Sequence, residues 1–331
     1  YTHFGVACFP CLPRDCGLNT NPKAMTMKII FAGSPEFAVP ALEKLLNSGK
    51  EVVAVVTQPD KPVGRKQILT PTPVKAFALS HGLPVYDFKR IRDNCEVLRA
   101  LNADIMITCA YGQLLTEEVL NCFKGGVWNI HASLLPKYRG ASPIQSAILN
   151  GETHTGVTIM KTELSLDTGD ILLVKRCEVG NLTCGELTEK LSVLGAEAAV
   201  EAVNFLEAGN VQLLMQDEAK ATLCKKVKKE DGKLDFSHSP QHICQLIKAF
   251  SPAPAAFCNF NGSILNIYNA EKSALSGGKT GEVLSADKHG IAVQCNGGSI
   301  LITELQPAGG KRMKAADFVN GRKIKAGDFL D

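Results

Sequence analysis

From Met27 onward, apolar runs of strand length alternate with segments of helical spacing, and this alternation limits the possible fold more than any other feature. Lys28–Ala32 and Glu51–Val56 predict strands, and the second is nearly all β-branched, as is typical of a parallel strand buried on both faces. Between them, Glu36–Asn47 has the apolar spacing of a helix. Strands that alternate with helices predict a parallel α/β sheet with right-handed crossovers.

The same alternation continues to about residue 210. Further strands are predicted at Leu83–Tyr86, Asp104–Cys109 and Val127–His131, and further helices at Val74–Ser80 and Leu191–Ala208. Gly33–Glu36 follows the first strand, where a dinucleotide-binding loop would lie, but it lacks the spaced glycines that let a backbone approach a pyrophosphate. The pattern predicts one α/β domain over residues 27–210 and argues against a nicotinamide or flavin cofactor.

Residues 211–232 are polar and Lys-rich, and the pattern changes after them. A helix is predicted at Pro240–Phe250, and short strands at Ala256–Phe260, Ile264–Tyr268, Gly281–Leu284, Ile291–Val293 and Ile300–Leu305. Gly-containing turn signals separate several of these strands, which predicts a linker over 211–232 and a small β-barrel over 233–331. Residues 220–331 hold 16 Lys and Arg against 10 Asp and Glu. This basic balance fits either a polyanionic partner such as RNA or a solvated surface.

Residues 1–26 show no helix or strand periodicity, and we expect them to be a non-native or disordered extension with Met27 as the start. Cys8 and Cys11 lack a second ligand pair at zinc spacing, so we expect no metal. The other cysteines, apart from Cys16, are scattered singly, which fits a reducing compartment such as the cytoplasm. No apolar run approaches the ~20 residues of a membrane-spanning helix.

The most informative polar residues lie where the predicted strand Val127–His131 ends. Asn129 and His131 are two residues apart, so an extended backbone points both side chains to the same side. An amide donor beside an imidazole can stabilise an oxyanion. Asp167 lies in a turn-forming sequence, and a carboxylate held near a histidine can orient it and assist proton transfer. The same residues are also compatible with ordinary loop hydrogen bonds and a tight turn.

Several motifs together make the chain recognisable. Asn129-x-His131 with Ser133–Pro136, and Asp167–Asp170 further along, resemble the 10-formyltetrahydrofolate-dependent transformylases. Phe31–Ala38 and Tyr138–Gln145, with Thr57–Pro62 and Thr70–Lys75, look like methionyl-tRNA formyltransferases within that family. The resemblance covers essentially all of residues 27–331.

The resemblance implies a Rossmann-like transformylase domain followed by an OB-like β-barrel that binds tRNA. It implies transfer of the formyl group of 10-formyltetrahydrofolate, as co-substrate, to the amino group of methionyl-initiator-tRNA. The implied catalytic residues are Asn129, His131 and Asp167. The folate-site candidates are Ser133, Leu134, Leu135, Pro136, Gly112 and Gln113. The tRNA-binding candidates in the Pro-rich, basic loop Lys61–Lys75 are Lys61, Arg65 and Lys66.

Three alternatives share part of this pattern. A glycinamide ribonucleotide transformylase would have the same trio but normally no second domain. A sugar-nucleotide formyltransferase has a different substrate loop and is often fused to a dehydrogenase, for which this chain is too short. A non-enzymatic RNA-binding protein would not need Asn129, His131 and Asp167 intact. We therefore expect a tRNA-formylating enzyme that is monomeric, cytoplasmic and not bound to membranes.

Overall fold

The structure is a computed structural model that describes residues 26–64, 66–321 and 323–331. Seven strands form the main sheet in the order β10-β9-β7-β6-β1-β2-β5. Their bounds are β1 Lys28–Gly33, β2 Glu51–Val56, β5 Val85–Tyr86, β6 Ile105–Cys109, β7 Val127–His131, β9 His154–Lys161 and β10 Ile171–Glu178. The first five strands in chain order pair in parallel, whereas β9 and β10 are antiparallel additions that the sequence analysis did not assign.

Both faces of this sheet are apolar, because successive residues of a strand point to opposite faces and are buried on each, so helices cover both faces. In β1, Ile29 and Phe31 face one apolar core while Ile30 and Ala32 face another, and all four are fully buried. The first core is covered by α1 (Val39–Asn47) and α6 (Cys184–Glu207), and the second by α3 (Cys95–Ala100) and α4 (Glu117–Leu120). The predicted parallel α/β class is thereby confirmed for the first domain.

The long helix α6 begins at Cys184, so the predicted start at Leu191 is wrong. Thr183 and Glu186 form a reciprocal capping box, in which the Thr183 side chain accepts from the Glu186 N–H and the Glu186 side chain accepts from the Thr183 N–H. The first turns also pack against the second domain, since Gly185 donates its N–H to the Ser251 carbonyl. The apolar spacing continues through these first turns, since Cys184, Leu187 and Leu191 are all buried, and the cap fixes where the helix begins.

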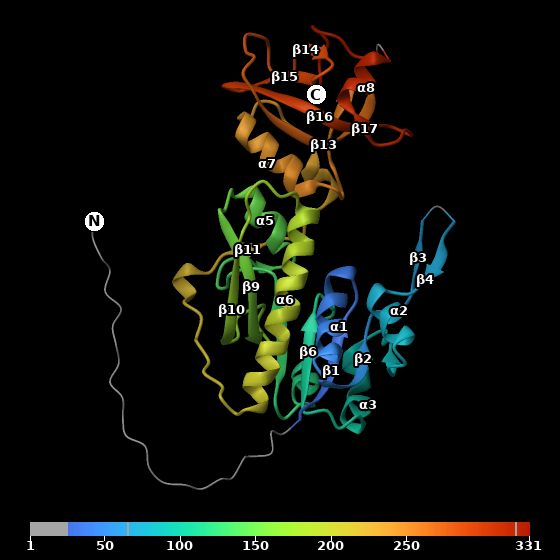
Figure 1. The fold of residues 1–331 in the computed structure, drawn as a ribbon, viewed down its shortest axis with the longest axis vertical. Coiled ribbons are helices and arrows are strands. Elements are labelled where there is room, and N and C mark those ends of the chain that lie inside the picture. The colour runs from blue at the N-terminus through green and yellow to red at the C-terminus, as the bar shows by residue number, and fades with distance from the viewer. Residues whose placement is uncertain (1–25, 65, 322) are drawn as a thin grey trace, which may run out of the picture.

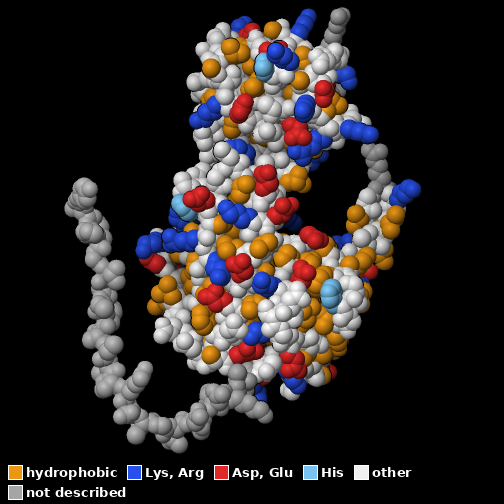
Figure 2. Space-filling view, in the orientation of Figure 1, with side chains coloured by type: hydrophobic (Ala, Val, Ile, Leu, Met, Phe, Trp, Pro, Cys, Tyr) orange, Lys and Arg blue, Asp and Glu red, His pale blue; other side chains and the backbone are white. Residues whose placement is uncertain are grey.

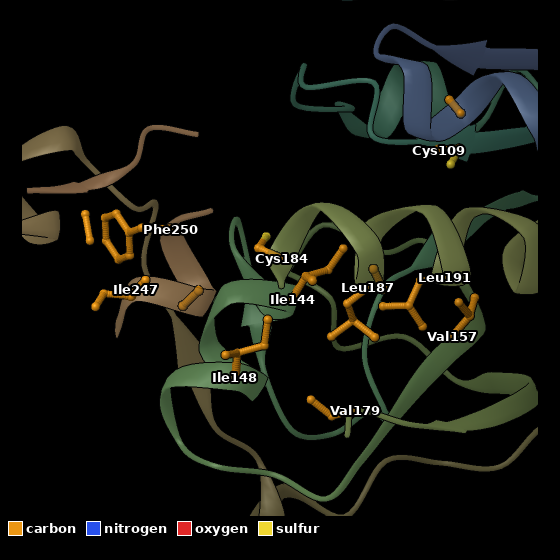
Figure 3. Packing of buried hydrophobic residues seen from close by; sticks show 14 of the residues in the cluster. Cys109, Ile144, Ile148, Val157, Val179, Cys184, Leu187, Leu191, Ile247 and Phe250 are labelled. Carbon is orange, nitrogen blue, oxygen red and sulfur yellow. The ribbon is translucent and has the colours of Figure 1, made fainter. Parts of the chain in front are cut away.

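One continuous apolar core joins the two domains. Helix α5 (Pro143–Leu149) lies between α6 and α7 (Pro240–Phe250), and Figure 3 shows its Ile144 and Ile148 between Leu187 of α6 and Ile247 of α7. These side chains are 8 % exposed or less. The domain junction is therefore as buried as a domain interior. Burying such side chains contributes roughly 1.5–3 kcal/mol each.

The second domain is an antiparallel barrel above the first domain in Figure 1. Its strands are β12 Ala256–Phe260, β13 Ser263–Ser273, β14 Val283–Asp287, β15 Gly290–Cys295, β16 Gly298–Pro307 and β17 Met313–Lys314, with α8 at Ala315–Asn320. The hydrogen-bonded order β12-β13-β16-β15-β14 leaves two edges. The chain end closes them, because Leu330 donates to Gly281 before β14 while Asp331 and Asn259 of β12 exchange backbone hydrogen bonds. The predicted small barrel is confirmed.

The stretch Lys61–Lys75, expected to be an irregular loop, contains a two-stranded hairpin, and that expectation is wrong. Strands β3 (Lys61–Val63) and β4 (Ile68–Thr70) pair antiparallel and project from the body in Figure 1. Gly64 and Gln67 begin and end the connection between the two strands with φ of +71° and +49°, and glycine adopts such a left-handed backbone without steric cost. Helix α2 (Pro73–Ser80) follows, with Thr72 as its N-cap.

The remaining elements are short. They are η1 Glu36–Ala38, η2 Ile91–Asn94, η3 Glu218–Lys220, η4 Lys229–Gly232, β8 Arg139–Gly140 and β11 Leu223–Cys224. The prediction for residues 1–26 and the Cys8–Cys11 pair falls outside the described residues, except at Thr26. Within the described ranges, no helix has the length and apolarity needed to cross a membrane.

Candidate active site

The candidate catalytic residues gather at the carboxyl edge of the parallel strands, which points toward the second domain in Figure 1. Asn129 and His131 lie at the end of strand β7, which pairs with β6 on one side and with β9 on the other. Asp167 lies in the connection from β9 to β10. Ligands of open α/β sheets bind at this edge, because the loops that follow parallel strands converge there.

Asn129 has a fixed amide orientation. The Thr108 hydroxyl, on the neighbouring strand β6, donates to Asn129 Oδ1 at 2.9 Å. With the Oδ1 end of the amide facing Thr108, the Nδ2 group of Asn129 lies on the opposite side. Asn129 is half-buried, so its N–H groups remain available to a substrate oxygen. Thr108 was not among the residues predicted from sequence, because its role depends on the β6–β7 register.

Replacing Thr108 with Val should lower kcat about fivefold, because the loss of one orienting hydrogen bond of ~1 kcal/mol lets the Asn129 amide rotate. Steady-state formyl transfer would measure the effect. Thr188→Val is the matched control, since the Thr188 hydroxyl donates to the Cys184 carbonyl within α6 and not to Asn129. Equal kcat in Thr108→Val and Thr188→Val would contradict the orienting role.

The Nε2 atom of His131 makes a hydrogen bond, whereas its Nδ1 atom makes none among the described residues. Its Nε2 lies 2.9 Å from the Tyr138 carbonyl, and a carbonyl can only accept, so Nε2 carries a proton. The lone pair of the neutral ring is therefore on Nδ1. Burial raises the pKa of the Cys224 thiol, which stays protonated and donates to the same Tyr138 carbonyl. This arrangement fixes the ring while leaving Nδ1 available for proton transfer.

Asp167 faces that free nitrogen. Its Oδ2 lies 3.7 Å from His131 Nδ1, which is an ion-pair distance and too long for a hydrogen bond. The same Oδ2 accepts the Gly140 N–H at 2.8 Å. Asp167 has a φ of +52°, a left-handed conformation that is uncommon outside glycine. A carboxylate held there can stabilise an imidazole that gains a proton during the reaction.

Gly169, two residues after Asp167, has no room for a side chain. A Cβ built on Gly169 would lie 1.8 Å from the Lys161 backbone oxygen, so only glycine fits beside that strand. Lys161 also donates its N–H to the Asp170 carbonyl. The Asp167–Asp170 turn is therefore held tightly against the end of β9.

The structure places the folate candidates in two groups. Ser133 and Leu135 are buried, with the Ser133 hydroxyl bonded to the Lys137 carbonyl, so a ligand could meet this segment only through its backbone, Leu134 or Pro136. Gly112 and Gln113 follow β6 and border a separate cavity. Gln113 there accepts from the Ile91 N–H at 2.8 Å and donates to the Phe88 carbonyl at 2.9 Å.

Two cavities help to locate the site. One of about 600 Å³ lies at the carboxyl edge and is lined by Gln58–Lys61, Lys89–Arg92 and Gly112–Leu114. The other, of about 760 Å³, lies at the opposite edge, where β1 and β7 begin, and its lining includes Met27, Gly125, Gly126 and Lys161. Neither cavity is lined by Asn129, His131 or Asp167, but the smaller one shares their edge of the sheet. We therefore place the candidate site at the carboxyl edge, where His131 and Asp167 meet.

The tRNA-binding candidates lie on the hairpin. Lys61 and Lys66 are exposed, and Lys61 Nζ contacts Gln58 Oε1. Arg65 lies outside the described residues. Lys75 at the base of the insertion pairs with both Asp60 and Asp87, and the hydrogen bonds to these carboxylates raise its pKa. Of the described basic residues on the insertion, Lys61 and Lys66 are thus free of carboxylate partners.

Comparison with known proteins identifies the family of this chain. Residues 27–203 match the formyl transferase family model, and residues 226–323 match the formyl transferase C-terminal domain model. The methionyl-tRNA formyltransferase of Geotalea uraniireducens is 44 % identical over 92 % of this chain and 98 % of its own length. That of Bacillus subtilis is 43 % identical over 92 % of this chain and 97 % of its own length. The solved methionyl-tRNA formyltransferase from Clostridium thermocellum has a TM-score of 0.53 at 15 % identity, covering 76 % of this chain and 95 % of its own.

Proposed function

This chain belongs to the methionyl-tRNA formyltransferase family, and on that premise we propose that Asn129, His131 and Asp167 are its catalytic residues. The reaction transfers the formyl group of 10-formyltetrahydrofolate to the free amino group of methionyl-tRNA. The observation that carries the proposal is the convergence of an oriented amide, an imidazole with a free Nδ1 and a carboxylate at one sheet edge.

The proposed chemistry follows from these three groups. As the substrate amine attacks the formyl carbon, negative charge develops on the formyl oxygen, and the Asn129 N–H groups stabilise it. His131 Nδ1, which has no hydrogen-bond partner among the described residues, accepts the proton that the attacking amine loses, and this proton goes to the folate nitrogen as its bond to the formyl carbon breaks. Asp167 stabilises the imidazole while it carries that proton. No step requires a covalent bond between the enzyme and the formyl group.

The carboxyl-edge cavity fits a carboxylate-bearing co-substrate such as a reduced folate. Its lining includes the basic residues Lys61, Lys89, Arg90 and Arg92. Gly112 has a φ of +79°, and a Cβ there would lie 2.7 Å from Gln58 Nε2, so glycine leaves the backbone open to close approach. Gln113 holds the Phe88–Ile91 segment beside it. We propose that Gly112, Gln113 and the Ser133–Pro136 backbone hold the folate, which supplies the formyl carbon.

The hairpin β3–β4 is proposed to contact the tRNA. It carries exposed Val63, Ile68 and Leu69 together with the exposed Lys61 and Lys66. In Figure 2 an opening separates the hairpin from the body, and Lys and Arg side chains lie on the hairpin and on the adjoining flank of the second domain. Such a surface combines phosphate neutralisation with apolar contacts to base or ribose groups.

Lys61→Ala and Lys66→Ala should each raise the KM for methionyl-tRNA several-fold with little change in kcat, because each removes about one phosphate contact. Each should also reduce the slope of log KM against log salt by about one. Lys124→Ala is the control, since Lys124 is also exposed but lines the cavity at the opposite edge. A kcat loss with an unchanged salt slope would contradict the tRNA-contact role.

The direct test of function is transfer of labelled formyl from 10-formyltetrahydrofolate to charged initiator methionyl-tRNA. Glycinamide ribonucleotide and an amino-sugar nucleotide serve as competing acceptors in parallel reactions. Formylation of the tRNA alone is the expected result. Transfer only to a small amine would overturn the substrate assignment while leaving the catalytic trio in place.

Cytoplasmic location and a monomeric state stay predictions from the sequence.

A further inference from the structure

The side-chain amide of Gln216 holds the turn that carries Asp167, and Gln216 lies outside both segments that match the formyl transferase family models. Gln216 lies between the two domains, at a position where the sequence suggested only a linker, yet it is 6 % exposed. Its Nε2 donates to the Asp167 carbonyl at 2.8 Å and to the Gly169 carbonyl at 2.7 Å. Both N–H bonds of the amide are therefore committed to the backbone on either side of Thr168.

A second contact fixes which way this amide points. Arg139 donates to Gln216 Oε1 from Nε at 3.1 Å and from Nη2 at 2.9 Å. Arg139 is itself buried and pairs with Glu218 through both terminal nitrogens. Because a guanidinium can only donate, it selects the oxygen end of the amide and directs the Gln216 N–H groups at the Asp167 turn.

The same segment holds the loop that contacts His131. The Tyr138 N–H donates to Thr222 Oγ1 at 2.9 Å, and the Arg139 N–H donates to the Thr222 carbonyl at 2.8 Å. Strand β11 pairs in parallel with β8, so that Leu223 and Cys224 lie beside Arg139 and Gly140. The segment Leu214–Cys224 thus contacts both the loop that accepts from His131 Nε2 and the turn that presents Asp167.

We propose that Gln216 is a positioning residue for catalysis, which acts by holding the Asp167 turn in its left-handed conformation opposite His131. This inference rests on the proposed function of the trio. The left-handed φ of Asp167 is not self-sustaining, since a non-glycine residue persists there only when its surroundings determine it. The Gln216 bonds hold the backbone of the turn on either side of Thr168, the Lys161 N–H holds the Asp170 carbonyl beyond them, and the Gly140 N–H holds the carboxylate itself.

Gln216→Met keeps the length of the side chain and removes all four hydrogen bonds. We expect kcat to fall about 10- to 100-fold, as for an ångström-scale displacement of a catalytic group, with the KM for methionyl-tRNA within about twofold of wild type. Gln212→Met is the matched control, because Gln212 is exposed in the same segment, and it should leave both constants unchanged. Gln216→Glu keeps an acceptor for Arg139 but lacks the N–H donors, so it should show the same kcat loss.

Hydrogen exchange at the Gly140 amide provides a readout without catalysis, because that N–H donates to Asp167 Oδ2. Gln216→Met should accelerate its exchange about tenfold or more while the β1 and β6 amides keep their protection. A kcat within twofold of wild type, a loss expressed only in KM, or exchange that rises only with global unfolding would each overturn the proposal. Lack of transfer by the wild type would instead contradict the proposed function, and Gly140 exchange would still decide the role of Gln216.

Discussion

Replacing His131 with Ala is expected to lower kcat for formylation of methionyl-tRNA about 10³-fold. General acid–base assistance by a positioned side chain is worth ~10²–10⁴-fold, and His131 is the group whose Nδ1 faces the Asp167 carboxylate while its Nε2 donates to the Tyr138 carbonyl. The KM for tRNA should change little, because His131 is only 5 % exposed and far from the hairpin lysines in the fold. Single-turnover transfer from labelled 10-formyltetrahydrofolate separates chemistry from binding.

His154→Ala controls for the loss of an imidazole, since His154 is exposed at the start of β9 and its ring hydrogen-bonds with the neighbouring Thr153. Thermal unfolding of both variants checks that the fold is retained, because removing a buried ring also creates a cavity. If folded His131→Ala keeps more than about a tenth of the wild-type kcat, His131 is not the acid–base group.

Replacing Asn129 with Leu should lower kcat about 10²- to 10³-fold, the usual cost of removing one oxyanion donor. Leu has a similar size, so the change removes the amide while largely keeping the packing around it. The measurement is kcat at saturating tRNA and folate, with KM values determined separately. Asn121→Leu is the control, because Asn121 is exposed at the end of α4 and lines the cavity at the opposite edge of the sheet from the candidate site.

The Thr108→Val and Asn129→Leu changes together provide a sharper test. If Thr108 acts only by orienting the Asn129 amide, then adding Thr108→Val to Asn129→Leu should cost almost nothing further, because the group that it orients is already gone. Multiplied losses in the double variant would indicate that Thr108 acts on its own. Equal losses of kcat and of substrate affinity in Asn129→Leu would contradict selective stabilisation of the developing charge.

Much of the first domain follows from local sequence. The strands at Lys28–Gly33, Glu51–Val56, Ile105–Cys109 and Val127–His131 were predictable because a parallel strand buried on both faces needs a continuous apolar run. The antiparallel strands β9 and β10 were not assigned. In β10 the alternation of half-buried and exposed residues reflects an edge position that only the strand order reveals.

The sequence by itself determined the pairing of Asn129 with His131, because a two-residue separation on any strand places both side chains on one face. The family motifs also singled out Asp167, but its approach to His131 depends on a left-handed turn held by Gly140 and Gln216. Those partners are 27 and 49 residues from Asp167 in the chain. Local propensity carries no information about contacts at such separations, so only the tertiary structure decided which nitrogen of His131 is free, which way Asn129 points, and that Gln216 contacts the Asp167 turn.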